Sequence, residues 1–258
     1  MNHPGFAESR GTGFSNLIPG ILIRRYKRFL ADVRLESGGI VTAHCPNPGR
    51  MTTCCDPGSR VYLSLHDSIR RKYRYTWELI QMPGSLVGVN PVMANRIVHQ
   101  GLCAGRIPSL AGYDAIHAEV PAGRGVRLDF LLEGPEKACF LEVKSCTLVE
   151  NRAARFPDAV TVRGVKHLVH MQRLLSDGFR CVLLFLVQRT DAEIFRPADD
   201  VDPVYGRRLR AAVARGLEIL AYDVKFDSNG IVLNHPLPIN LQQADARALQ
   251  CKASIQSA

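Results

Sequence analysis

The feature that most restricts the fold is an uninterrupted apolar run at residues 181–187, the longest of its kind in the chain. A run this short cannot cross a bilayer, and it predicts a strand that is buried on both faces. Residues 161–178 carry apolar side chains at helical spacing, and the hydroxyl of Thr161 is placed to cap that helix. Asp202 followed by Pro203 predicts the start of another helix. This alternation of helices with buried strands indicates an α/β domain.

Strand-like runs upstream complete the expected sheet. A helical pattern at residues 91–103 precedes three of them, and turn signals at 121–125 and 134–137 separate the runs. A meander of strands followed by helix, strand, helix and strand is typical of a domain with a mixed sheet. The expected strands of this sheet are residues 115–120, 126–132, 138–147, 181–187 and 217–222.

The first third of the chain has a different pattern. Between residues 21 and 89, short strand-like runs alternate with turn signals such as Ser37-Gly38-Gly39. About five short strands in roughly 70 residues is the scale of an OB-like β-barrel, whose sheet face commonly binds nucleic acid. We therefore predict an α/β (α+β) chain of two domains, an OB-like barrel at residues 1–89 and a mixed-sheet domain at 90–258. The barrel runs are residues 29–35, 40–45, 60–65 and 75–81.

The charge of the chain predicts its partner. A formal net charge of +9 attracts polyanions, and no amphipathic basic helix indicates a membrane surface. DNA, bound without sequence preference, is therefore the expected partner, although a basic protein without a nucleic-acid ligand can carry the same charge. The N-terminal region lacks the order of parts of a signal peptide, so we expect a cytoplasmic location. The sequence carries no signal for the oligomeric state.

One predicted hairpin carries the pattern with the most specific chemistry. Glu142 and Lys144 point to one face of a strand, because side chains two residues apart share a side. If Pro135 and Glu136 form the centre of the turn, Asp129 lies directly opposite Glu142. Two carboxylates about 5 Å apart repel by roughly 3 kcal/mol at an effective dielectric constant of about 20. A divalent cation bound by both offsets that repulsion, so Mg²⁺ or Mn²⁺ is the expected cofactor.

The same residues are suited to phosphodiester hydrolysis. A metal polarises the phosphate and activates a water, and Lys144 can orient that water or stabilise developing charge. Asp129, Glu142 and Lys144 are therefore the candidate catalytic residues, with Asp129 and Glu142 as metal ligands. If the preceding hairpin is regular, Glu119 and His117 point to the same face as these carboxylates. Glu119 is then a candidate for a further metal ligand, and His117 is a weaker candidate. A Glu-x-Lys triplet alone occurs about once by chance in such a chain, so its combination with Asp129 and the turn carries the signal.

Two clusters that mix cations with an aromatic ring are candidates for DNA contact. One surrounds Tyr26 and the other surrounds Tyr73, and such a mixture suits phosphate contact together with base stacking. The alternative is a solvated strand edge, where positive charge discourages edge pairing. Arg163 and His167, four residues apart at the start of a helix, can face phosphate or form a surface pair. The candidate DNA-binding residues are Arg24, Arg25, Tyr26, Lys27, Arg28, Arg50, Arg71, Lys72, Arg74, Arg163 and His167.

Asp129 followed by Glu142-Val143-Lys144 resembles the PD-(D/E)XK nuclease motif. Nearly the whole chain is similar to the sugar fermentation stimulation protein A (SfsA) family. The resemblance implies an OB-like first domain, a restriction-endonuclease-like second domain, and a bacterial DNA-binding factor linked to sugar metabolism. The segments that carry it are residues 24–29 (RRYKRF), 43–47 (AHCPN), 75–79 (YTWEL) and 156–159 (FPDA), with Arg163-Gly164 and His167-Leu168.

One loop departs from the pattern of that family. After Asn47 the chain has Pro48-Gly49-Arg50 in place of Thr-Gly-Ser. If this loop contacts phosphate, the loss of the hydroxyl groups and the gain of Arg50 change how it does so.

Three functions are compatible with the sequence. The first is a DNA-binding protein with a Mg²⁺- or Mn²⁺-dependent nuclease site of the PD-(D/E)XK type. The second is a non-catalytic, non-specific DNA-binding regulatory factor that retains the fold, and the third is a protein-interaction scaffold. The joint presence of Asp129, Glu142 and Lys144 favours the first over a decayed site.

Overall fold

The apolar run predicted as a buried strand is β12 (Arg180–Val187), in the middle of a six-stranded sheet of the computed structural model. The structure describes residues 16–68, 70–123, 125–227 and 230–243. The other strands of the sheet are β7 (Ala115–Gly123), β8 (Val126–Glu133), β9 (Cys139–Cys146), β14 (Glu218–Asp227) and β15 (Gly230–Pro236). Their order is β15-β14-β12-β9-β8-β7, and β12 runs parallel to both neighbours while the other pairs are antiparallel. The predicted mixed sheet is confirmed.

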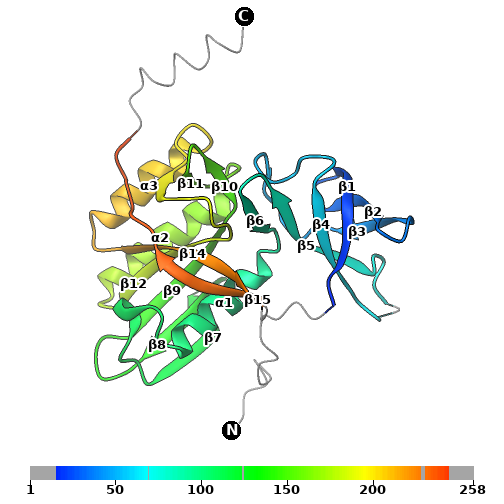
Figure 1. The fold of residues 1–258 in the computed structure, drawn as a ribbon. Coiled ribbons are helices and arrows are strands. Elements are labelled where there is room, and N and C mark those ends of the chain that lie inside the picture. Colours follow the sequence, from blue (N-terminus) through cyan, green and yellow to red (C-terminus); the bar gives the residue numbers. More distant parts are fainter. Residues whose placement is uncertain (1–15, 69, 124, 228–229, 244–258) are drawn as a thin grey trace, which may run out of the picture.

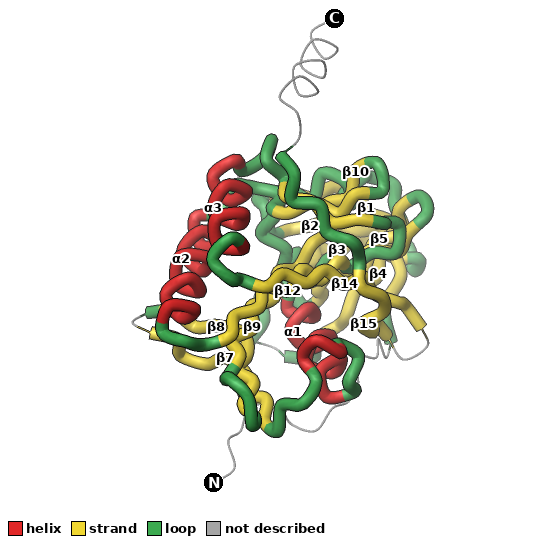
Figure 2. Tube along the Cα trace, turned by 90° about the vertical axis from the view of Figure 1, so that its left-hand side faces the viewer, coloured by secondary structure: helices red, strands yellow, loops and turns green. Residues whose placement is uncertain are grey.

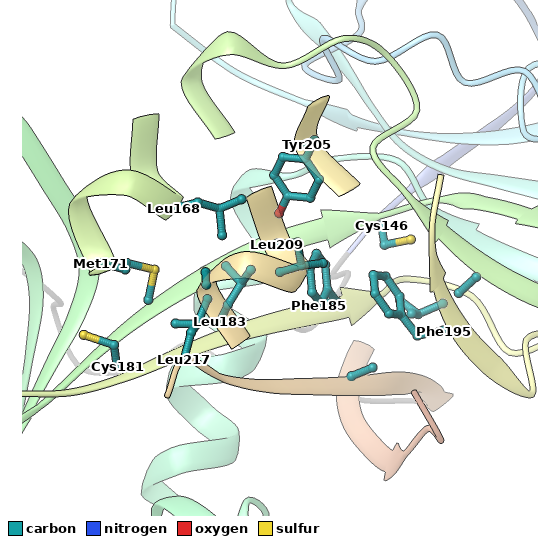
Figure 3. Close-up of a cluster of buried hydrophobic side chains, with 14 of the residues drawn as sticks. Cys146, Leu168, Met171, Cys181, Leu183, Phe185, Phe195, Tyr205, Leu209 and Leu217 are labelled. Atoms are coloured by element: carbon teal, nitrogen blue, oxygen red, sulfur yellow. The ribbon is translucent and has the colours of Figure 1, made fainter. Parts of the chain in front are cut away.

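Three helices cover the two faces of this sheet. They are α1 (Val92–Cys103), α2 (Val162–Ser176) and α3 (Pro203–Val213). α1 packs on one face, in a buried cluster that includes Phe130 and Leu141. α2 and α3 pack on the other face, where Leu168 and Tyr205 belong to the same buried cluster as Phe185 of β12 (Figures 2 and 3). None of the described helices has both the length and the apolar character needed to span a membrane.

Both predicted helix caps are present. The side chain of Thr161 accepts a hydrogen bond from the backbone N–H of Gly164, at 3.0 Å, at the start of α2. The carboxylate of Asp202 accepts one from the backbone N–H of Tyr205, at 2.9 Å, at the start of α3. Each cap satisfies a donor that the first turn of a helix leaves unpaired. The capping residues therefore fix where both helices begin.

The first domain is a small barrel, drawn in blue to cyan in Figure 1. Its strands are β1 (Ile18–Tyr26), β2 (Leu30–Leu35), β3 (Ile40–His44), β4 (Arg60–Leu65), β5 (Tyr75–Met82) and β6 (Ser85–Gly88). The order is β3-β2-β1-β4-β5-β6, and a parallel pairing of β3 with β5 closes the barrel. Trp77 is fully buried inside it, with Leu22 and Leu63. The OB-like barrel is confirmed, and the tryptophan is a core residue.

The sequence does not predict several of the observed strands, among them β1, β6 and β15. β1 ends in the basic segment around Tyr26, and a bulge between Leu22 and Arg24 interrupts the alternation of its side chains, which hides the strand pattern. A three-stranded sheet of order β10-β11-β13 has strands of three or four residues, which are too short to show a period. These are β10 (Leu148–Glu150), β11 (Ala153–Phe156) and β13 (Ile194–Pro197), and a short 3-10 helix, η1 (Pro108–Leu110), was also not predicted.

The predicted turn at residues 121–125 is shorter than expected. β7 continues to Gly123, and Pro121 pairs with Arg127 of β8. A proline is tolerated there because β7 is the last strand of the sheet, and no described strand pairs with its outer side.

Hydrogen bonds join the barrel to the mixed-sheet domain. The backbone N–H of Gly88 donates to the carbonyl of Gln188 at 2.8 Å. The guanidinium of Arg189 donates to the carbonyl oxygen of Thr53 at 3.2 Å. The backbone N–H of Met51 donates to Asp158 Oδ2 at 3.3 Å. These polar contacts therefore dock the barrel on the mixed-sheet domain.

Candidate metal centre and interdomain cleft

The hairpin of β8 and β9 positions the candidate carboxylates. Phe130 pairs with Leu141, which is the register that the predicted turn requires. The regular pairing ends there, so Asp129 and Glu142 do not form the directly opposed pair expected from the sequence. Instead, the Asp129 carboxylate accepts a hydrogen bond of 2.7 Å from the backbone N–H of Val143. This bond ties Asp129 to the residue that follows Glu142.

Glu142 is buried, and basic groups hold one of its two carboxylate oxygens. Oε1 contacts both Lys144 Nζ and His167 Nδ1. Burial alone would raise the pKa of Glu142, but the hydrogen bond with His167 and the charge of Lys144 outweigh it and keep the pKa below its usual value. The other oxygen, Oε2, is buried without a hydrogen-bond partner among the described residues. Glu142 is therefore an ionised carboxylate with one oxygen that accepts no hydrogen bond from the described residues.

Asp129 is held by a side chain from α1, which packs on the face of the sheet opposite to α2. Asn95 of α1 donates to Asp129 Oδ1 at 2.8 Å, while the Val143 N–H donates to Oδ2. Burial and, secondarily, the negative charge of Glu142 raise the pKa of Asp129 to about 6. The two carboxylates are therefore close enough to repel each other, as the sequence predicts. At neutral pH most Asp129 side chains are still ionised.

The donor groups at this point fit a hard divalent cation. Mg²⁺ is commonly bound through one or two carboxylates and completes its coordination with waters. Asp129 and Glu142 supply two carboxylates, and a buried carboxylate oxygen without a partner, such as Oε2 of Glu142, is costly. A cation held by Glu142 Oε2 and Asp129 would remove that cost and the repulsion between the two groups.

Glu119 and His117, the other candidate ligands, do not join this pair. Glu119 is exposed, and its backbone lies in the left-handed region at a φ of 53°, so the first hairpin is not regular there. His117 Nε2 lies 2.8 Å from a carboxylate oxygen of Glu133, and both side chains are about half exposed. Within the described ranges, no group of three or more His, Cys, Asp or Glu side chains is placed to hold a metal. The candidate centre therefore consists of two carboxylates.

The raised pKa of Asp129 predicts how the stability of the metal-free protein depends on pH. The folded state binds the Asp129 proton more tightly than the unfolded state, with a pKa of about 6 against an ordinary 3.8. The stability that this proton contributes is complete below the unfolded pKa and is lost as the pH rises through the folded pKa. We expect the free energy of unfolding to fall by up to about 3 kcal/mol between about pH 4 and pH 7, relative to Asp129→Asn.

Urea unfolding of both proteins in EDTA, at several pH values, measures this difference. Glu142 titrates at lower pH because its pKa is lowered, so the range from about pH 4.5 to 7 isolates Asp129. A stability difference that stays constant over this range would contradict the buried, repelled state of the Asp129 carboxyl group.

Lys144 lines a cleft of about 450 Å³ between the two domains. The mixed-sheet domain also contributes Arg163 at the start of α2, and the barrel contributes Arg28 and the loop at residues 47–49. A β-carbon on Gly49 would lie 2.0 Å from Asp158 Oδ2, so the domains meet closely here only because residue 49 has no side chain. The candidate metal centre therefore lies next to a cleft that both domains build.

Two of the candidate DNA-binding residues line this cleft, namely Arg28 and Arg163, and both are exposed. Arg25 has a different role, because its guanidinium donates to three backbone carbonyl oxygens of residues 47, 49 and 50. It holds the loop that forms the barrel side of the cleft. The other barrel candidates lie outside the lining: Arg24, Tyr26, Lys27, Arg50, Arg71, Lys72 and Arg74.

His167 is buried and contacts the Glu142 carboxylate. It is therefore not at the protein surface and does not form a surface pair with Arg163. Its nearest contact with Arg163 is a bond of 3.5 Å from Arg163 Nε to His167 Nε2. The sequence indicates the position of His167 on the correct side of α2 but not its partner. Asn95 was missed entirely, because nothing in its local sequence links it to Asp129.

Family models match both domains of the chain. Residues 23–89 match the model described as the SfsA N-terminal OB domain. Residues 92–230 match the model described as the sugar fermentation stimulation protein RE domain. The two matches meet between residues 89 and 92, where the barrel ends and α1 begins.

Relatives match over nearly their whole length. A sugar fermentation stimulation protein homolog of Geobacter sulfurreducens is 51% identical over 223 residues, which is 86% of this chain and 96% of the relative. A homolog of Maricaulis maris is 45% identical over 231 residues, or 89% of this chain and 98% of the relative. The solved structure of SfsA from Pyrococcus furiosus in complex with Ca²⁺ superposes with a TM-score of 0.81 at 28% identity, covering 88% of this chain and 97% of that one.

Proposed function

The chain belongs to the sugar fermentation stimulation protein family, and from this premise we propose that it binds DNA and hydrolyses phosphodiester bonds with Mg²⁺ or Mn²⁺. The observation that carries the proposal is the buried Glu142 carboxylate, whose Oε2 has no hydrogen-bond partner within the described residues, while Asp129 lies nearby. Bound there, the metal supplies a Lewis acid that polarises a phosphate and makes an attacking water more acidic.

The residues around the centre have distinct roles in this proposal. Asp129 and Glu142 hold the cation, and Asn95 fixes the orientation of Asp129 through its hydrogen bond. His167 fixes Glu142 in the same way. Lys144 contacts Glu142 and lines the cleft, so its ammonium group can stabilise negative charge on a phosphate there.

DNA contact in this proposal depends on charge and not on base edges. Arg28 and Arg163 line the cleft from opposite domains, and cations of this kind bind phosphate without reading sequence. We therefore propose binding without sequence preference. A divalent ion is further supported by the Pyrococcus furiosus relative, which was solved with Ca²⁺, a hard cation that prefers oxygen ligands as Mg²⁺ does.

A cleavage assay with Mn²⁺ on single- and double-stranded DNA and RNA tests the proposed hydrolysis. We expect the wild-type protein to release products with Mn²⁺ and none with EDTA, and Asp129→Ala to release none in either condition. Glu133→Ala is the matched control, because Glu133 is an exposed acid on the same strand β8. Products formed at equal rates by the wild type and Asp129→Ala would remove this site from the chemistry.

DNA binding without cleavage is the second candidate function. It is favoured by one observation: Glu142 Oε1 already contacts two basic groups, and both oxygens of Asp129 accept hydrogen bonds. The two carboxylates are thus partly neutralised without a metal. In this case the same assay gives no products with any metal, while the wild type and Asp129→Ala bind DNA equally.

A further inference from the structure

The rim of the interdomain cleft carries two exposed apolar side chains. Val160 and Val162 each expose 67%, the largest fraction among the exposed large hydrophobic side chains of the described residues. They flank Thr161, the N-cap of α2, and Val160 itself lines the cleft. These two side chains form a small exposed apolar patch beside the cleft.

The same cleft is cationic. Arg28 comes from the barrel, and Lys144 and Arg163 come from the mixed-sheet domain. Within the described part of the chain, neither Arg28 nor Arg163 forms an ion pair with an acidic side chain. The acidic residue of the lining, Asp158, accepts a hydrogen bond from the backbone of Met51. Lys144 is paired with Glu142, so the cations of the lining without an ion pair among the described residues are Arg28 and Arg163, and Val160 adds exposed apolar surface to the same lining.

A ligand that matches both features has anionic groups next to a flat apolar face. A nucleotide has this combination, because its phosphate is anionic and its base has two apolar faces. In an intact duplex these faces are stacked on neighbouring bases, and the grooves present only base edges. Valine side chains can therefore contact a base face without the cost of unstacking a duplex where the strand is unpaired.

The size of the cleft leads to the same ligand. Pockets of about 300–1,000 Å³ enclose small molecules, and the cleft has a volume of about 450 Å³. That volume lies within this range and accommodates a single nucleotide. A duplex would have to lie across the rim, where Val160 and Val162 protrude.

We propose that the cleft takes a nucleotide of an unpaired DNA strand, with its phosphates at Arg28, Arg163 and Lys144 and its base against Val160 and Val162. The inference rests on the proposed function, since it names the substrate class of the same site. That class is single-stranded DNA, or the unpaired strand of a branched DNA, and not an intact duplex.

Fluorescence anisotropy in EDTA tests this inference without cleavage. The probes are a labelled single strand and the blunt duplex of the same length and sequence. We expect the single strand to bind at least about tenfold tighter, because only its unpaired base can bury apolar surface against the two valine side chains. The double variant Val160→Ser with Val162→Ser removes this apolar contact and should bind the single strand about tenfold more weakly and the duplex as before. Ile40→Ser is the matched control, since Ile40 is 64% exposed and lies outside the lining of the cleft.

Each outcome decides for or against the inference. Equal or tighter binding of the duplex overturns it, and so does an unchanged single-strand affinity of a double-serine variant that keeps the far-ultraviolet circular dichroism of the wild type. Single-strand preference without products under Mn²⁺ keeps the inference and rejects the proposed hydrolysis. Products from a protein that binds duplex as tightly as single strands keep the hydrolysis and reject this substrate class.

Discussion

Replacing Arg189 with methionine is expected to lower the free energy of unfolding by about 3–5 kcal/mol. Arg189 is only 4% exposed, and its guanidinium donates to the Asp191 carboxylate at 2.7 and 2.6 Å. It also donates to the carbonyl oxygens of Thr53 and Thr147 at 3.2 and 3.0 Å. Methionine keeps the apolar stem but leaves these acceptors without their donor, and removing one partner of a buried ionic network is the costly way to break it.

This network also joins the two domains. Thr53 belongs to the barrel, whereas Thr147 and Arg189 belong to the mixed-sheet domain, and Thr147 lines the cleft. Urea unfolding followed by far-ultraviolet circular dichroism and by the fluorescence of Trp77, which reports on the barrel core, measures the loss.

Arg152→Met is the matched control for this prediction. Arg152 also pairs with a carboxylate, that of Glu193, but the two side chains are 68% and 62% exposed. Water screens such a pair, so its loss should leave the stability almost unchanged. An equal decrease in the free energy of unfolding for both variants would contradict the prediction that burial makes the contacts of Arg189 more important for stability than those of Arg152.

The sheet and the barrel could be predicted because their signals are local. The apolar run at residues 181–187 indicates a strand buried on both faces by itself, and the caps Thr161 and Asp202 need only their own helices. The register of the β8–β9 hairpin was also predictable, since a short turn fixes it. Strands of three or four residues, as in β10, β11 and β13, lack enough positions to show a pattern.

The candidate centre was predictable only in part. The parity of a strand places Glu142 and Lys144 on one face, and the structure shows them in contact. The contacts of Glu142 with His167 and of Asp129 with Asn95 depend on how α2 and α1 pack on opposite faces of the sheet. Such contacts between distant segments leave no local signal.

The cleft could not be predicted from the sequence for the same reason. It exists because the barrel docks on the mixed-sheet domain, with Gly49 against Asp158 and the backbone N–H of Met51 bonded to the same carboxylate. The sequence identifies Arg28 and Arg163 as candidates for DNA contact, but only this docking brings both residues into the lining of the same cleft.

Replacing Glu142 with glutamine is expected to weaken Mn²⁺ binding by about a hundredfold or more and to end Mn²⁺-dependent cleavage. Glutamine keeps the shape of the side chain but removes the charge that attracts the cation. The variant also lacks the anion that Lys144 and His167 contact through Oε1. Because the charge of Glu142 raises the pKa of Asp129, that pKa should fall in the variant.

Titration calorimetry of Mn²⁺ into the metal-free wild type, Glu142→Gln and the exposed-acid control Glu133→Gln tests the two-carboxylate metal centre most directly. We expect the wild type and the control to bind a single ion with equal affinity, and Glu142→Gln to bind it about a hundredfold more weakly. Equal affinity of the wild type and Glu142→Gln, or no binding of Mn²⁺ by the wild type, would contradict the assignment of Oε2 of Glu142 as a metal ligand.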